Sequence, residues 1–259
     1  MQKRSLLDKF KNNRISKFIR NGFSIKPAFI DTSKINSSAM ISDSFIWRTH
    51  GNFSTMFKFS DILRLFLNKK HSSADVYFYN HENNLIKKIN INELKISNSI
   101  KIDQNFLNGY SGFGYFHMFF KNQFIKEMEK TVFSNRCYLG FSYKNKLPSF
   151  VHGNVYAFSK DFELKNDNYN FVNTSFFKNQ KYIIQNSFID FDYSELFFTN
   201  PTNKKINFTI NNVEYSLKKF TSKIIKIENT NVVEIISNCY WLRPIIFNYK
   251  NDFIDVYHS

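Results

Sequence analysis

From residue 44 onward, the chain alternates short runs of β-branched and aromatic residues with polar clusters of Asn, Asp, Ser and Lys. Such runs, bounded by turn-forming residues, are typical of β-strands. In the first part of the chain, strands are predicted at 45–49, 62–67, 75–79, 85–91, 99–102, 114–120, 137–143 and 150–158. Later strands are predicted at 171–177, 181–184, 196–199, 206–210, 213–217, 223–227, 232–236, 242–249 and 255–258. The pattern therefore predicts an all-β protein.

One segment within this region has a different period. Residues 122–132 place Phe124, Ile125, Met128 and Val132 at the spacing of one helix face. We expect a single small helix here, inserted between two strands.

Part of the pattern occurs twice. Phe-Ser-Tyr-Lys-Asn begins at Phe141 and is followed by His152, and Phe-Asn-Tyr-Lys-Asn begins at Phe247 and is followed by His258 at the same spacing. The runs before each motif also match in order, pairing 62–67 with 196–199, 75–79 with 206–210, 85–91 with 213–217, 99–102 with 223–227 and 114–120 with 232–236. The sequence thus indicates an internal duplication, with the helical insertion in the first copy only.

Each motif is interpreted as a β-hairpin. Four-residue loops are predicted at 145–148 and 251–254, where Asn tolerates the left-handed backbone region. This register would place Phe141 opposite His152, and the second copy would pair in the same way. Many short strands with hairpins and few helices favour two tandem antiparallel β-sandwich domains.

The domain boundaries follow from these patterns. Residues 1–36 form a basic N-terminal segment, and 37–160 form the first sandwich repeat with its insertion at 122–132. Residues 161–180 are a linker or edge strand, and 181–259 form the second repeat.

The N-terminal segment carries a strong charge pattern. Residues 2–20 contain seven Lys or Arg and one acid, Asp8, with Leu7, Phe10, Phe18 and Ile19 roughly on one helical stripe. A short basic amphipathic helix is predicted. It could be an organelle-targeting peptide, an arm that touches RNA or lipid, a docking segment for an acidic partner, or a frayed terminus.

Composition narrows the class of protein. Aromatic residues make up 19% of the chain and Gly and Pro are scarce, which excludes fibrous and proline-rich disordered proteins. The heavy use of Lys, Asn, Ile and Phe is the pattern of an AT-rich genome. A net charge of +15 attracts nucleic acid, anionic glycans or acidic lipids, although the lysines are scattered as on a solvated face.

The sequence also bears on location and assembly. It has no apolar window long enough to span a bilayer and no secretory signal pattern, so a cytoplasmic protein is expected. Cys137 and Cys239 are expected to be reduced. Unpaired sheet edges could join copies into a homo-oligomer.

Sequence motifs of common enzymes are absent: there is no phosphate loop, dinucleotide turn, nucleophile elbow or His-Glu-x-x-His helix. His50 and His152 each begin a His-Gly-Asn triplet, and together with His117 they could hold a divalent metal. Alternatively, these rings bond to neighbouring carbonyls while Gly-Asn turns the chain. No cofactor is expected.

The run from Ser111 to Met118 resembles the octamer of the RNA-recognition motif at Gly112, Phe113, Gly114 and Tyr115, which implies aromatic rings that stack on bases. It departs from that octamer where a basic, an aliphatic and an aromatic residue are expected. An aromatic core strand relieved by glycine is the alternative.

Trp47 beside Arg48, and Trp241 near Arg243, could stack on a sugar or a cation, or could be core residues.

These observations favour a non-catalytic or accessory binding protein that recognises a glycan or an anionic polymer. The candidate ligand-binding residues all lie in the first copy: Trp47, Arg48, His50, Asn52, Tyr115, His117, His152 and Asn154. Two alternatives remain open. One is an RNA-associated protein of an AT-rich organism or organelle, and the other is a metal-dependent enzyme that uses His50, His117 and His152.

Overall fold

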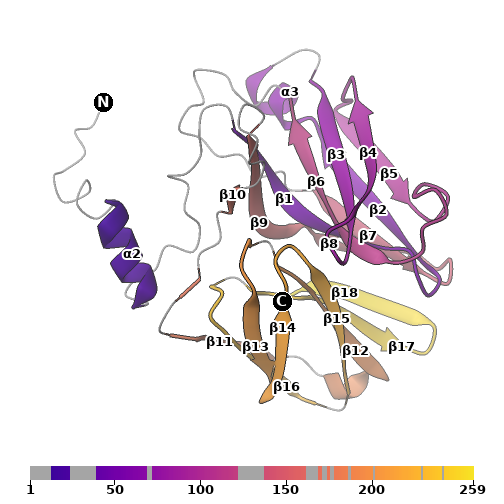
Figure 1. Cartoon of the computed structure of the whole chain (residues 1–259). Coiled ribbons are helices and arrows are strands. Elements are labelled where there is room, and N and C mark those ends of the chain that lie inside the picture. The colour runs from indigo at the N-terminus through magenta and orange to yellow at the C-terminus, as the bar shows by residue number, and fades with distance from the viewer. Residues whose placement is uncertain are drawn as a thin grey trace.

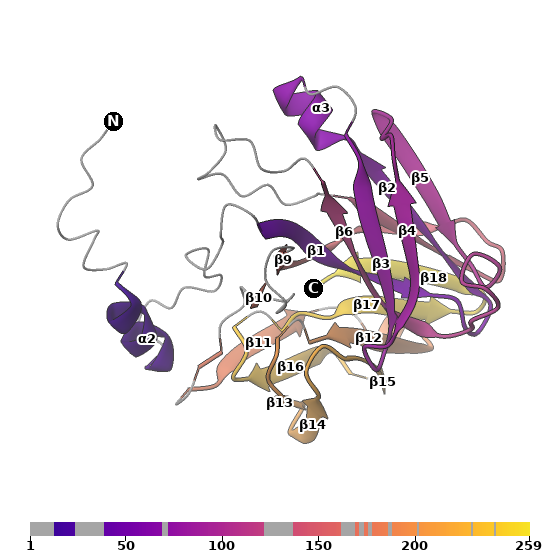
Figure 2. The same ribbon diagram turned by 45° about the horizontal axis from the view of Figure 1, so that its top comes forward.

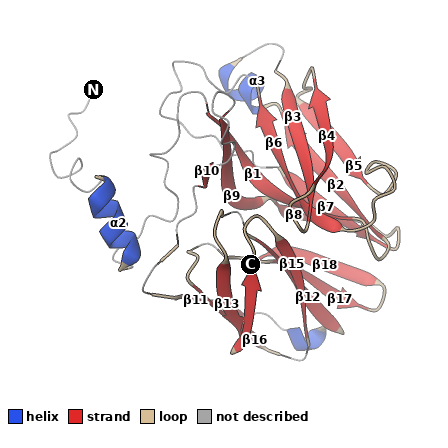
Figure 3. Ribbon diagram, viewed as in Figure 1, coloured by secondary structure: helices blue, strands red, loops and turns tan. Residues whose placement is uncertain are grey.

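The computed structural model consists mainly of antiparallel β-strands (Figure 1, Figure 3), which confirms the predicted all-β class. It describes residues 13–23, 39–68, 72–121, 137–161, 169–170, 174–175, 178–185, 188–200, 202–228, 230–240 and 242–259. The helix predicted at 122–132 and Trp241 lie outside these ranges. Within them, no helix has both the length and the apolar character needed to cross a bilayer.

The first part of the chain contains α2 (Arg14–Gly22), β1 (Ala39–Arg48), β2 (Phe53–Ser60), α3 (Ile62–Leu67), β3 (Ala74–Asn80), β4 (Leu85–Ile91), β5 (Ser97–Ile102), β6 (Phe113–Phe120), β7 (Tyr138–Tyr143), β8 (Ser149–His152), β9 (Asn154–Asp161) and β10 (Tyr169–Asn170). The second part contains β11 (Gln180–Gln185), the 3-10 helix η3 (Phe188–Asp190), β12 (Tyr193–Thr199), β13 (Ile206–Ile210), β14 (Val213–Leu217), β15 (Ser222–Ile227), β16 (Val232–Ser237), β17 (Ile245–Lys250) and β18 (Phe253–His258).

The strands form four antiparallel sheets. A six-stranded sheet has the order β10-β9-β1-β6-β3-β4, and a four-stranded sheet has the order β5-β2-β7-β8. The later strands form the sheets β11-β16-β13-β14 and β15-β12-β17-β18. The order β1-β6-β3-β4 in the first part corresponds to β11-β16-β13-β14 in the second, and β5-β2-β7-β8 corresponds to β15-β12-β17-β18. The two parts of the chain therefore repeat one strand order. We call β1–β9 the first unit and β11–β18 the second unit.

The correspondence of strands corrects one sequence prediction. Residues 62–67, predicted as a strand, form helix α3, and the counterpart of β12 is β2, which the sequence pattern missed. Asp61 caps this helix by accepting a hydrogen bond from the Arg64 backbone N–H at 3.0 Å, and Asn68 ends it with a φ of 51°. Local capping therefore decides the structure of an apolar run that is short enough to suit either element.

The hairpin register also differs from the prediction. Phe141 lies opposite Ser149, and His152 lies opposite Tyr138. In the second unit, Phe247 lies opposite Val256. Two residues join β17 to β18, whereas the β7–β8 connection is longer. As a result, the strand pairing of the β17–β18 hairpin is shifted by one position relative to that of the β7–β8 hairpin. The two histidines of the repeated motif are therefore not structural equivalents.

The predicted strand at 150–158 is divided in the structure. Gly153 separates β8 from β9, and these strands belong to different sheets. A Cβ at Gly153 would lie 2.4 Å from the Phe45 ring. Glycine is thus needed where the chain passes from one sheet to the other beside a core aromatic residue.

Two large hydrophobic clusters fill most of the described core, and a small third cluster contains Tyr77 and Phe119. The first combines inward residues of the six-stranded sheet, such as Phe78 and Phe116, with residues of β2 and β7, such as Phe57 and Phe141. It continues into the second unit through residues of β12, β17 and β18, such as Phe247. The second combines residues of β12, β15 and β17 with residues of β11, β13, β14 and β16. Alternate residues of β2 are buried, as expected when one face of a strand covers a core.

The units meet where β7 and β8 lie against β17 and β18 (Figure 1). The rings of Phe141 and Phe247 lie 4.8 Å apart, and those of Tyr143 and Tyr249 lie 5.7 Å apart. Ser149, which faces Phe141, accepts a hydrogen bond from the backbone N–H of Val256, which faces Phe247, at 2.9 Å. Contacts between a residue and its own counterpart are the mark of an isologous interface, so the units pack like the subunits of a two-fold dimer.

Candidate functional site

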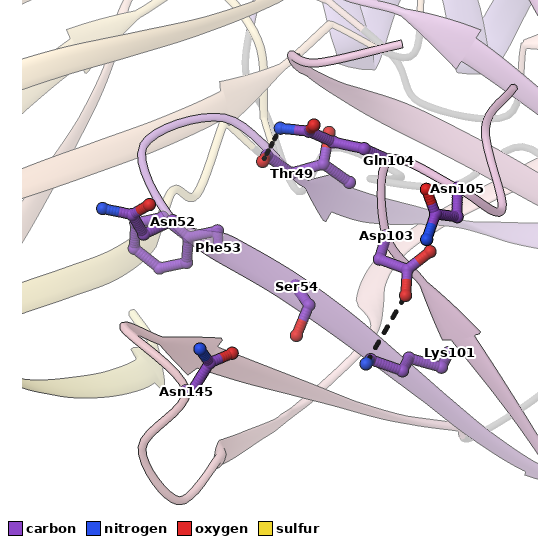
Figure 4. A pocket seen from close by; sticks show the side chains of 9 residues that line it. All are labelled: Thr49, Asn52, Phe53, Ser54, Lys101, Asp103, Gln104, Asn105 and Asn145. Carbon is purple, nitrogen blue, oxygen red and sulfur yellow. Dashed lines mark hydrogen bonds and ion pairs between the residues drawn. The ribbon is translucent and has the colours of Figure 1, made fainter. Parts of the chain in front are cut away.

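A polar cleft with a volume of about 300 Å³ opens at one end of the first unit (Figure 4). Three segments that are distant in sequence contribute to it: the β1–β2 turn, the end of β5 with the loop that follows, and the β7–β8 loop. The lining residues are Thr49, Asn52, Phe53, Ser54, Lys101, Asp103, Gln104, Asn105 and Asn145.

One wall of the cleft is formed by the β1–β2 turn and the neighbouring β7–β8 loop, and it depends on residues that accept a left-handed backbone conformation. Gly51 and Asn52 have φ angles of 63° and 66°, and Asn145 in the neighbouring loop has a φ of 58°. Glycine and asparagine adopt this region more readily than other residues. The backbone N–H of Lys144 donates to the Asn52 carbonyl at 3.0 Å. The turn and the β7–β8 loop are thereby held side by side, with an amide side chain on each.

The opposite wall is the segment after β5. Asp103 accepts a hydrogen bond from the Phe106 backbone N–H at 2.9 Å and forms an ion pair of 3.4 Å with Lys101. The Gln104 amide donates to the Thr49 carbonyl at 3.5 Å and to the Ser111 hydroxyl at 3.2 Å. Figure 4 shows the ion pair and the Gln104 contact with Thr49. The polar groups of this wall are therefore positioned before any ligand arrives.

A buried charged cluster lies beneath Phe53. The Arg48 guanidinium carbon is 4.0 Å from the centre of the Phe53 ring, and Arg48 forms an ion pair with Glu195 of the second unit. Arg48 also donates to the Tyr249 hydroxyl at 2.9 Å, and that hydroxyl donates to Glu195 at 2.6 Å. Burial raises the pKa of Tyr249, so the phenol stays protonated. This cluster joins the units directly behind the cleft.

His50 stands at the edge of this cluster. Its Nε2 is 3.3 Å from an Arg48 nitrogen, and its Nδ1 is 3.2 Å from the Gly112 carbonyl oxygen. Burial and the neighbouring Arg48 charge lower the pKa of His50. A neutral ring that donates from Nδ1 and accepts from Arg48 at Nε2 satisfies both contacts.

Of the candidate residues predicted from the sequence, only Asn52 lines the cleft, with Arg48 and His50 close behind it. Trp47 is fully buried, and its indole N–H donates to the Tyr79 carbonyl at 2.9 Å. His152 is exposed beside the Tyr138 ring.

Asn154 lies opposite Ser44 in the ladder between β9 and β1, and its side chain is outside the described part of the structure.

The three histidines considered for a metal site lie in separate surroundings. His117 is buried in β6 with its Nδ1 3.2 Å from the Asp43 carbonyl oxygen, and burial lowers its pKa to about 4. His50 faces Arg48, and His152 lies on β8. Among the described residues, no group of three or more His, Cys, Asp or Glu side chains could hold a metal ion.

The two His-Gly-Asn triplets have different structural roles. Gly51 and Asn52 form the turn between β1 and β2, as expected. Gly153 instead gives space to Phe45, and Asn154 already belongs to β9.

The strand that resembles the RNA-recognition octamer is largely buried. Tyr115 is 4% exposed, and its hydroxyl donates to Asn83. A Cβ at Gly114 would lie 2.1 Å from the Tyr79 carbonyl oxygen, so glycine allows β3 to approach. Stacking on bases requires exposed aromatic faces, which Tyr115 does not provide in this structure. These contacts are those of an aromatic core strand.

Comparison with known proteins identifies no relative: no protein-family model and no curated protein matches the chain. Among solved structures, an anti-sigma factor domain-containing protein aligns at 12% sequence identity over 82% of this chain and 80% of that chain, with a TM-score of 0.23. This degree of likeness supports no statement about fold or function. Both must therefore be argued from the residues of the chain itself.

The cleft contains seven polar residues that the sequence did not single out as ligand contacts: Thr49, Ser54, Lys101, Asp103, Gln104, Asn105 and Asn145. Such residues are common throughout this chain, so their presence does not by itself indicate a binding site. One sequence feature could have pointed to Asn145, because this residue ends the repeated Tyr-Lys-Asn motif of the predicted hairpin.

Proposed function

We propose that this chain is a non-catalytic binding protein that recognises a hydroxyl-rich ligand, such as a glycan, in the cleft of the first unit. The observation that carries the proposal is the lining: four side-chain amides, two hydroxyls and one carboxylate around one opening. Each amide both donates and accepts hydrogen bonds, as does each sugar hydroxyl. The cleft is thus complementary to a polyol.

The charge of the cleft favours a neutral glycan over an anionic polymer. Lys101 is the one cation among the lining residues, and Asp103 neutralises it at 3.4 Å. The net charge of +15 belongs to the whole chain and would attract polyanions elsewhere on the surface. Binding in the cleft is therefore expected to depend little on salt, unlike binding of a polyanion.

We also propose that residues 37–160 and 181–259 are two β-sandwich domains that arose by duplication, joined by 161–180. The repeated strand order supports this organisation, as does a core cluster formed by residues of the second unit alone. The ninth strand, β9, belongs to the first unit, and the cleft also lies in that unit, which agrees with a binding role for it.

A glycan array followed by NMR titration of any hit tests the binding proposal. The decisive variant is Asn145→Gly, since glycine keeps the left-handed backbone and removes only the amide. Loss of its hydrogen bonds is expected to weaken binding about tenfold. Gln104→Ala, on the opposite wall, is expected to have a similar effect.

Asn251→Gly is the matched control, because Asn251 ends the second copy of the motif, has a φ of 53° and lies outside the cleft. It should leave the affinity unchanged. Equal effects of Asn145→Gly and Asn251→Gly would contradict the proposal, as would an array without hits. If heparin or RNA binds in a salt-sensitive way that Gln104→Ala does not alter, the ligand is a polyanion bound outside the cleft.

A further inference from the structure

The helix α2 presents apolar side chains to solvent. It stands apart from the sheets in two views (Figure 1, Figure 2). Ile15, Phe18 and Ile19 are 68%, 64% and 48% exposed, and Phe23, just after the helix, is 57% exposed. The Phe23 backbone N–H donates to the Ile19 carbonyl at 3.0 Å, so it continues the helical pattern.

These four residues occupy one side of the helix. At 3.6 residues per turn, positions 15, 18, 19 and 23 fall within one arc of the helical circumference. A soluble domain normally turns such a stripe toward its core. A contiguous apolar stripe that remains exposed usually marks an interaction surface.

The other side of the helix is basic. The helical period of 3.6 residues places Arg14, Lys17 and Arg20 on the opposite arc. Position 16, between the two arcs, is a serine, and α2 contains no acidic residue. Upstream, residues 2–12 add four basic residues against Asp8. A partner must therefore offer an apolar layer next to dense negative charge.

We propose that α2 binds the surface of a membrane that contains anionic lipids. Helices with Phe and Ile on one face and Lys and Arg on the other lie in the plane of the bilayer interface. Their apolar side chains enter the acyl boundary while the basic side chains remain among the phosphates. The net charge of +15 on the whole chain adds a longer-range attraction to such a surface.

Two features of α2 suit this role. Asn13 caps the helix by accepting a hydrogen bond from the Ile15 backbone N–H at 3.2 Å, so the first turn is fixed without support from the sheets. The helix has nine residues and is too short to cross a bilayer, which leaves the interface as the place where it can bind lipid.

Co-sedimentation of the full chain with lipid vesicles tests the proposal. Vesicles of phosphatidylcholine with phosphatidylserine should bind the chain much more strongly than vesicles of phosphatidylcholine alone. Raising the salt from about 0.1 M to about 1 M should weaken binding, because the Debye length shortens about threefold.

The decisive variant is the double substitution Ile15→Gln and Ile19→Gln. Gln has high helix propensity, so the helix should persist while the apolar stripe is lost. The partition coefficient should fall by more than about tenfold. The matched control is Leu147→Gln, which removes a side chain that is 91% exposed in the β7–β8 loop and should not change binding.

Phe18→Trp supplies a second measurement. Its fluorescence should shift to the blue when anionic vesicles are added, relative to the unsubstituted chain. The proposal is overturned if the chain binds no vesicles, if the double variant binds like the unsubstituted chain, or if Leu147→Gln has the same effect. Binding to an acidic peptide such as polyglutamate without vesicle binding would instead assign the helix to a protein partner.

Discussion

At the scale of single residues, Gly114 allows three strands to pack closely. A Cβ at this position would lie 2.1 Å from the Tyr79 carbonyl oxygen and 2.8 Å from backbone atoms of Asn80. Gly114 faces Trp47 in the ladder, and the Trp47 indole donates to the same Tyr79 carbonyl. Backbone atoms cannot rotate away as a side chain can. We therefore expect Gly114→Ala to lower the free energy of unfolding by about 1–3 kcal/mol, measured by urea denaturation.

Gly140→Ala provides the comparison. The nearest atoms to its added Cβ would be ring atoms of Phe150, a side chain that is 41% exposed and can shift more readily than backbone. This variant should lose less than about 1 kcal/mol. If both alanine variants lose the same stability, the close approach of β3 is not what requires glycine at position 114.

At the scale of elements, the β17–β18 hairpin depends on the backbone of its turn. Asn251 has a φ of 53°, and its backbone N–H donates to Asp192 at 2.7 Å. Asn tolerates this left-handed region, whereas a β-branched residue is strained there. Asn251→Val is expected to lower the free energy of unfolding by about 1–2 kcal/mol, while Asn251→Gly should stay within about 0.5 kcal/mol of the unsubstituted chain. Thermal unfolding followed by circular dichroism would measure both, and equal losses would show that the turn geometry is not limiting.

At the scale of the whole molecule, the Arg48–Glu195 pair couples the two units. Its side chains are only 6% and 16% exposed, and Tyr249 bonds to both. Removing one partner leaves a buried charge uncompensated, which typically lowers stability by about 3–5 kcal/mol. We expect Glu195→Gln to lose about 3 kcal/mol. Adding Arg48→Met to that variant should cause little further loss, because no charge then remains buried.

A double-mutant cycle on urea denaturation checks this coupling. A coupling energy above about 1 kcal/mol is expected for residues that share one network. Additive effects of the two substitutions would mean that the pair does not act as a unit, and that other contacts, such as those of Phe141 and Tyr143 with their counterparts, hold the interface.

Much of the strand order could be predicted from the sequence, because alternation and turn residues act locally. The repeated motif correctly matched β7 with β17 and, through its neighbours, β3 to β6 with β13 to β16. Residues 62–67 were predicted wrongly, since the capping by Asp61 and Asn68 outweighs an apolar pattern that fits either element. The predicted hairpin register was wrong in both units because each turn lies earlier in the chain than the predicted loop, so that Phe141 pairs with Ser149 and Phe247 pairs with Val256.

The candidate site was far less predictable. Trp47, Tyr115 and His117 have chemically versatile side chains and drew attention in the sequence, but the structure buries them. The cleft is instead lined by common polar residues of loops, and only Asn52 was among the predicted ligand contacts. Residue type alone does not separate a loop asparagine that faces a cleft from one that only turns the chain.

The sequence by itself determined the all-β class and the repeated order of strands, because both depend on the spacing of neighbouring residues. Of the basic helix predicted in residues 2–20, the part from Arg14 is helical, and residues 2–12 lie outside the described residues. Only the tertiary structure decided which residues meet. The cleft joins the β1–β2 turn, the segment after β5 and Asn145, and the isologous interface joins β7 to its own counterpart. Both depend on how the sheets pack, and packing is set by the shape and burial of side chains that are distant along the chain.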